Sequence, residues 1–185
     1  MTSAWANFVG YEVVWFCAVI AAAHGLAWPA VAAFVLFAAW QIGVSRRRQV
    51  QWRLLVLALG CGVVLGGAFS VSGLIGYATP HPALPPGGAP VWILALWGAL
   101  ALTLTSSLRY LQKNLWLACA LGALGGPLAF WSAAQAWNVV RFANPQWHAL
   151  LALAVGWALA MPLLAGMARR WETRAPAASL RRRYP

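Results

Sequence analysis

Six apolar runs, separated by short connections, constrain this chain more strongly than any other feature of its sequence. A transmembrane helix needs about 20 predominantly apolar residues, and most of the runs approach or reach that length. We therefore predict an all-α fold, a polytopic integral membrane bundle of six transmembrane helices. The runs lie near Trp5–Gly25, Pro29–Val44, Leu54–Ile75, Val91–Leu111, Leu115–Asn138 and Trp147–Met167.

The composition excludes several classes of protein. Of the 185 residues, 63% are hydrophobic and 8% are charged, which leaves too little polar surface to cover a soluble globule. Thirteen basic residues against two acidic ones would suggest nucleic-acid binding in a soluble protein, but here the basic residues fall between apolar runs. We therefore expect no nucleic-acid partner, and the length leaves no room for a large appended enzyme domain.

The basic residues predict the orientation of the bundle. If all six runs cross the membrane, residues 46–53, residues 109–113 and the segment from Arg169 onward share one side and hold twelve of the thirteen basic residues. Only Arg141 falls on the other side. The positive-inside rule makes the basic side cytoplasmic, so both termini are expected there. We assign residues 1–168 to a transmembrane domain and residues 169–185 to a basic cytoplasmic tail attracted to anionic lipid.

Polar residues inside the apolar runs form the first candidate site. Glu12 lies about two turns into the first run, where an ionisable side chain is costly unless it is paired, protonated or hydrated. We expect Arg109, at a similar depth near the end of the fourth run, to pair with it. Thr103, Ser106 and Ser107 precede Arg109 at helical spacing. This group is interpreted either as a structural pair with packing hydroxyls or as a polar site that handles a substrate headgroup or a proton.

A proline after two glycines interrupts the fifth run. Pro127 lacks the N–H that a helix interior needs, and Gly125 and Gly126 give no side-chain support. We predict a helix break or kink at this point. Broken helices line cavities in many transporters, and a simple packing kink is the alternative interpretation.

Three histidines form a second, weaker candidate site. The predicted topology places His24, His81 and His148 on the outer side, although they are far apart in sequence. Together they would be low-ranked ligands for a metal or haem, but no pair has helical or hairpin spacing and no carboxylate accompanies them. The alternative is three interfacial histidines with no shared role. We predict no catalytic residue and no cofactor.

Several short stretches occur in the order found in one known family. The most specific are Ser-Leu-Arg-Tyr-Leu at residues 107–111 and Gly-Gly-Pro-Leu at residues 125–128, and Tyr11 and Trp28–Pro29 precede them. Over roughly its first four fifths, the chain resembles the bacterial inner-membrane family called domain of unknown function 2878. It departs from the family pattern in three places, with Glu12 in place of glutamine, Ser106 in place of a frequent histidine, and Gly66 or Gly67 in place of an acidic residue.

The resemblance implies a membrane-lipid context, since members are often encoded near fatty-acid-modifying methyltransferase-like and flavoprotein-like proteins. We expect a non-enzymatic accessory or scaffold protein of the bacterial inner membrane, in lipid modification or envelope maintenance. Its expected partners are membrane lipids, with lipid-modifying proteins and a second copy of the chain as further candidates. The alternatives are a small transporter or lipid-handling protein with an intramembrane polar site, and an intramembrane enzyme or metal protein.

Overall fold

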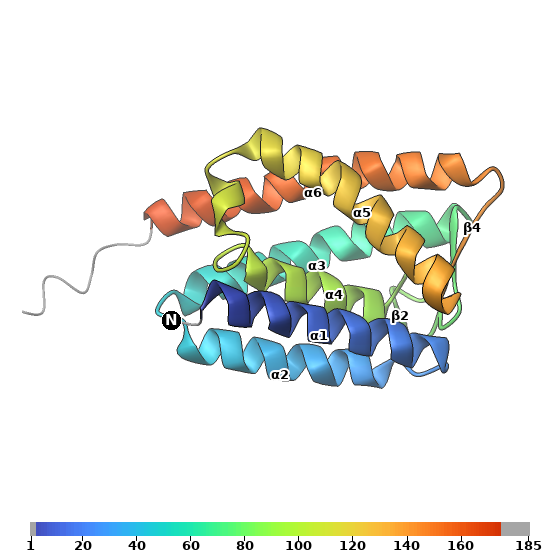
Figure 1. Cartoon of the computed structure of the whole chain (residues 1–185), viewed down its shortest axis with the longest axis horizontal. Helices are drawn as coiled ribbons and strands as arrows, with labels where there is room; N and C mark the ends of the chain where they lie inside the picture. The colour runs from blue at the N-terminus through green and yellow to red at the C-terminus, as the bar shows by residue number, and fades with distance from the viewer. Residues whose placement is uncertain (1–2, 175–185) are drawn as a thin grey trace, which may run out of the picture.

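The structure, a computed structural model, describes residues 3–174 as a bundle of helices that run back and forth along one axis (Figure 1). Both ends of the described chain lie at the same end of this bundle. The all-helical fold is confirmed. Within the described residues the α-helices are α1 (Ala4–Ala23), α2 (Trp28–Val44), α3 (Arg48–Val71), α4 (Val91–Thr103), α5 (Leu115–Trp137) and α6 (Gln146–Arg174), with one 3₁₀ helix, η1 (Arg109–Gln112).

Two small antiparallel sheets cover the other end of the bundle. Strand β1 (Ile75–Tyr77) pairs with β4 (Val140–Phe142), and β2 (Ala83–Leu84) pairs with β3 (Ala89–Pro90). The side chain of Thr79 joins this cap to the helices, because its Oγ1 donates a hydrogen bond to the Ala22 carbonyl (2.7 Å). The Thr79 carbonyl in turn accepts from the indole Nε1 of Trp92 in α4 (2.9 Å). We call this the capped end.

Helix α4 lies at the centre of the bundle. From Trp92 to Thr103 every residue except Leu96 is buried, and α4 packs against α1, α2 and α3. A helix that is apolar on all sides is buried on all sides, so α4 presents little surface to lipid. Its 13 residues span about 20 Å, less than the roughly 30 Å of a hydrocarbon core, and the surrounding helices supply the remaining length.

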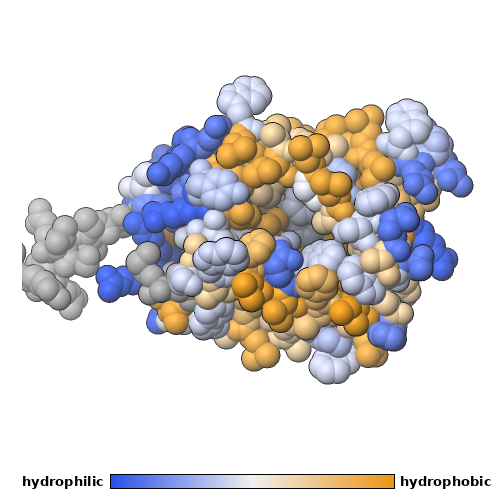
Figure 2. Space-filling model, in the orientation of Figure 1, coloured by the Kyte–Doolittle hydropathy of each residue, from blue (hydrophilic) through white to orange (hydrophobic). Residues whose placement is uncertain are grey.

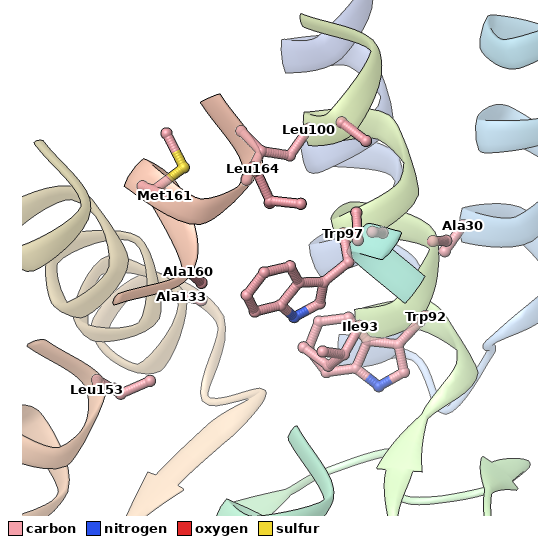
Figure 3. Packing of buried hydrophobic residues seen from close by; sticks show 14 of the residues in the cluster. Ala30, Trp92, Ile93, Trp97, Leu100, Ala133, Leu153, Ala160, Met161 and Leu164 are labelled. Atoms are coloured by element: carbon pink, nitrogen blue, oxygen red, sulfur yellow. The ribbon is translucent and has the colours of Figure 1, made fainter. Parts of the chain in front are cut away.

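A pair of stacked indoles joins α4 to α6 within the core. The rings of Trp97 and Trp157 are nearly parallel, with their centroids 4.4 Å apart. Figure 3 shows the Trp97 indole pointing from α4 toward Ala160 of α6 and Ala133 of α5. Glycine at position 62 makes room for this ring, since a Cβ there would lie 2.7 Å from Trp97.

The outer surface is that of a membrane protein. In residues 3–174 four helices, α1, α3, α5 and α6, are long and apolar enough to cross a membrane, and α2 and α4 are shorter. Hydrophilic residues gather at the two ends of the molecule and apolar ones around its middle (Figure 2). Near both ends large tryptophans are exposed, as at the two interfaces of a bilayer. They include Trp5, Trp52 and Trp116 at one end and Trp28 and Trp147 at the other.

Two predicted helix boundaries are corrected. The fourth helix ends at Thr103 and not at Leu111, because hydroxyl side chains bond to helix carbonyls: Thr103 Oγ1 donates to the Leu100 carbonyl (2.6 Å). Leu108 N–H then bonds to the Thr103 carbonyl and closes a turn. The sixth helix continues past Met167 to Arg174, so the first part of the expected basic tail is helical. Residues 175–185 of that tail lie outside the described residues.

Of the break or kink predicted at Gly125, Gly126 and Pro127, the break is wrong and the kink stays a prediction. Helix α5 runs through Pro127 from Leu115 to Trp137. The physical reason is close packing, because a Cβ on Gly126 would collide with the indole ring of Trp157 in α6. The glycine therefore lets α5 and α6 approach and supports a continuous helix pair.

Candidate functional site

A nearly buried carboxylate stands at the centre of the basic end, the end of the bundle opposite the capped end. The side chain of Glu172, in the last turn of α6, is 7% exposed. Its Oε2 accepts from Arg47 Nη1 (2.8 Å) and from Arg109 Nη2 (2.7 Å). Its Oε1 accepts from Gln112 Nε2 (3.4 Å). One carboxylate thus joins the α2–α3 connection, η1 and α6.

A cavity of about 250 Å³ opens beside this cluster. It lies between the ends of α2 and α3 and the irregular segment that follows α4, and we call it the cationic cavity. Nine of its ten lining residues are polar or charged, and they come from α2, α3, η1, α6 and the connections that follow α2 and α4. The lining residues are Gln41, Val44, Ser45, Arg46, Arg47, Gln51, Thr105, Ser106, Arg109 and Glu172.

A wider groove of about 490 Å³ adjoins the cationic cavity and shares Arg47, Arg109 and Glu172 with it. The groove adds two more basic side chains, Lys113 and Arg169. Together the two hollows are lined by five basic residues and one acidic residue. Guanidinium groups are suited to carboxylates and phosphates, because their N–H donors match the geometry of two oxygens. The arrangement can therefore bind an oxyanion.

Buried side-chain amides support the irregular backbone at residues 104–108. Asn7 of α1 is fully buried, and its Oδ1 accepts from the N–H (3.2 Å) and the hydroxyl (2.6 Å) of Ser107. Gln112 Nε2 also donates to the Leu104 carbonyl (2.8 Å). Non-helical backbone at membrane depth is tolerated where it is buried in protein and its polar groups have partners. These amides hold the wall of the cationic cavity in place.

Gln51 of α3 brings a further polar group to the cavity. The residue is 4% exposed, and its Nε2 donates to Thr105 Oγ1 (3.3 Å). Among the residues that the structure describes, its buried Oε1 has no hydrogen-bond partner. Leaving such a buried carbonyl oxygen without a hydrogen bond costs stability, and this oxygen can accept a hydrogen bond from a hydroxyl group.

The structure brings together part of the predicted polar site. Arg109 and Ser106 line the cationic cavity. Thr103 and Ser107 instead satisfy protein groups, so the expected stripe of hydroxyls along one helix face does not exist. The expected direct pair of Glu12 with Arg109 is wrong. Helix α4 ends before Arg109, and the segment that follows places Arg109 beside α6, where its guanidinium forms an ion pair with Glu172.

Glu12 stays on the membrane-spanning part of α1. It is partly buried, and within residues 3–174 the ion pairs found are both made by Glu172. Sequence reasoning missed Glu172 and Arg47. The available signal was that Glu172 is one of two acidic residues in the chain and stands among basic ones, next to a helix that had no clear stop.

The three histidines lie at the capped end, in separate segments of the chain. His24 follows α1, His81 lies between β1 and β2, and His148 lies in the first turn of α6. In the described part of the chain no group of three His, Cys, Asp or Glu side chains is placed to hold a metal ion.

Comparison with known proteins gives one result. The model of a family described as "Protein of unknown function (DUF2878)" matches residues 4–163, from the first turn of α1 into α6. Arg47 and Arg109 lie within the matched residues, and Glu172 lies after them. No curated protein and no solved structure matches the chain.

Proposed function

The chain belongs to the DUF2878 family of proteins of unknown function, and from this premise we propose that it is a membrane accessory protein that binds the phosphate of anionic lipid headgroups in the cationic cavity. The observation that carries the proposal is the convergence of Arg47 and Arg109 on one nearly buried oxygen acceptor, 2.8 and 2.7 Å away. Both arginines remain about half exposed, so a ligand can reach them.

The position of the cavity favours a lipid over a soluble anion. It lies at the basic end, where the apolar helices end and where the exposed tryptophans Trp5, Trp52 and Trp116 are suited to a membrane interface. Lipid phosphates lie at this level of a bilayer. Each basic residue near an anionic leaflet contributes about 1 kcal/mol of attraction, so the basic end would concentrate anionic lipid before any specific contact forms.

The proposal includes a topology and a location. All six helices cross the bacterial inner membrane, and α4 is surrounded by the neighbouring helices. The basic end, with both termini, faces the cytoplasm. The role is non-enzymatic, in lipid modification or envelope maintenance, and consists of presenting a bound lipid to a modifying protein. Support for this role is the residue resemblance to a family in a lipid context, together with the anion-binding geometry.

A second candidate function, lipid handling or transport, is favoured by a separate apolar groove. This groove of about 870 Å³ lies toward the capped end, and α2 and α3 line both it and the cationic cavity. Val31 and Phe34 of α2 and Leu59 and Val63 of α3 form part of its walls. An acyl chain suits such a surface, and movement of lipid between the two sites would distinguish a transporter from an accessory protein.

Native mass spectrometry of the detergent-purified chain tests the proposal. Titration with short-chain phosphatidylglycerol and phosphatidylcholine should show retention of the anionic lipid in preference to the zwitterionic one. Arg109→Gln and Arg47→Gln should each weaken phosphatidylglycerol binding about tenfold, as expected for loss of a charge-assisted hydrogen bond worth about 1.5 kcal/mol.

The matched control is Arg141→Gln, which removes the same charge from β4 at the capped end. It should leave binding unchanged. Equal retention of both lipids by the wild-type protein, or equal weakening by all three substitutions, would show that the arginines act through net charge and not as a site.

A further inference from the structure

Glu172 occupies the position in which the proposed function places a phosphate. We infer that the Glu172 carboxylate is an internal occupant of the anion site, and that the site is built for a phosphate monoester dianion, which displaces it from Arg47 and Arg109. This inference rests on the proposed function and adds the ligand class and the regulation of the same site.

The contacts of Glu172 are those of a bound oxyanion. Two guanidinium nitrogens approach one oxygen and an amide nitrogen approaches the other, from two separate segments of the chain, the α2–α3 connection and η1. A terminal phosphate has three oxygens that can take these donors. Arg46 and Ser106 also line the cavity, and they offer donors that do not contact the Glu172 carboxylate.

The charge balance favours a dianion. If a monoanionic phosphodiester replaced the Glu172 carboxylate, the negative charge beside Arg47 and Arg109 would be unchanged. The exchange would therefore bring little electrostatic free energy. A phosphomonoester carries close to two negative charges at neutral pH, since its second pKa is about 6. The second charge meets Arg46, Lys113 and Arg169, which line the same two hollows without forming an ion pair within residues 3–174.

The displaced carboxylate has a new partner at hand. Arg169 lies three residues before Glu172 on α6, a spacing at which helix side chains meet, and Lys113 lines the same groove. Displacement would therefore leave Glu172 beside other cations. Displacement would also break the ion pairs that hold the end of α6 to the α2–α3 connection and to η1. Ligand binding would therefore increase the mobility of this helix end.

The test compares two substitutions that remove the same charge. Glu172→Gln and Glu12→Gln neutralise the only acidic residues of the chain, one in the cavity and the other on α1 outside it. Binding of phosphatidic acid, phosphatidylglycerol and phosphatidylcholine is measured by native mass spectrometry at pH 8 and pH 5. The wild type should bind phosphatidic acid roughly tenfold more tightly than phosphatidylglycerol at pH 8, and that preference should vanish at pH 5, where both lipids are monoanions.

Glu172→Gln should tighten phosphatidic acid binding about tenfold, and Glu12→Gln should not change it. If Glu172→Gln does not yield folded protein, Glu172→Asp serves instead, because its shorter side chain cannot keep both arginines and should also tighten binding. Inorganic phosphate and glycerol phosphate, used as competitors, show whether the bound phosphomonoester is a lipid headgroup or a soluble molecule. Competition at concentrations similar to that of phosphatidic acid would assign the site to a soluble phosphomonoester and overturn the lipid source.

The failures of the two proposals are distinguishable. If Glu172→Gln leaves binding unchanged or weakens it, or if phosphatidylglycerol binds as tightly as phosphatidic acid at pH 8, the inference is overturned. The proposed function then still stands, provided that Arg109→Gln weakens anionic lipid binding. If neither anionic lipid binds more tightly than phosphatidylcholine, both proposals fail together.

Discussion

Single side chains determine where α4 ends and what the chain does next. Thr103 and Thr105 bond back to helix carbonyls, and Asn7 reaches across from α1 to take the backbone N–H of Ser107. The chain can then leave the helix at membrane depth without stranding its polar groups. The turn that follows carries Arg109 to Glu172 and so creates the cationic cavity.

Asn7→Leu should destabilise the protein by about 1 to 3 kcal/mol, because it leaves the partly buried N–H of Ser107 without its acceptor. Ser107→Ala is the matched control, since it removes a hydroxyl from the same contact and keeps the backbone bond. It should cost about 1 kcal/mol or less. Unfolding of the purified variants in mixed micelles with increasing SDS measures both, and equal stability of Asn7→Leu and wild type would contradict the role given to Asn7.

Polar residues in apolar runs can be found by reading the sequence, but their partners cannot. Ser106 and Arg109 were placed in a polar site and do line the cationic cavity. Glu12 was expected to be the acid because it is the one inside a span. The actual partner, Glu172, lies 63 residues after Arg109, and nothing local shows that the sixth helix extends far enough to bring it there.

Close contacts between helices in this bundle form where a glycine of one helix packs against a large side chain of another. Gly122 and Gly126 of α5 face Trp157 of α6, and Gly62 of α3 faces Trp97 of α4. The sequence alone does not show which helix fills the space beside each of these glycines. The sequence also does not show the tertiary packing around Pro127. Local reasoning therefore predicts a break there, whereas helix α5 is continuous.

Gly126→Ala should destabilise the bundle by about 1 to 3 kcal/mol, because the added methyl group overlaps the Trp157 indole and forces α5 and α6 apart. Gly125→Ala provides the control in the same helix, since a Cβ there meets no atom within 4 Å. It should change the stability by less than about 1 kcal/mol. Thermal unfolding followed by near-UV circular dichroism compares the two, and equal effects would show that Trp157 does not determine the helix contact.

The bundle taken together has two unlike ends. Apolar runs and basic connections predicted six helices that alternate in direction, and the structure has six, with both described termini at the basic end. The sequence could not show that α4 is the central helix, because burial on all sides and contact with lipid require the same apolar residues. It also could not show that residues 75–90 and 140–142 form two small sheets over the capped end.

Membrane orientation is tested by labelling cysteines placed at the two ends. Pro86 at the capped end and Gln49 at the basic end are both exposed, and each is changed to cysteine after Cys17, Cys61 and Cys119 are replaced by alanine. In intact cells a membrane-impermeant maleimide should label position 86 and should reach position 49 only after permeabilisation. The reverse pattern would contradict a cytoplasmic basic end.

The most direct measurement is an electron cryomicroscopy structure of the chain in nanodiscs that contain phosphatidic acid. We predict headgroup density in the cationic cavity, with phosphate oxygens within hydrogen-bond distance of Arg47 and Arg109 and with Glu172 moved toward Arg169. An empty cavity, with the Glu172 carboxylate still bound to both arginines at saturating phosphatidic acid, would contradict the assignment of this end of the protein to anionic lipid.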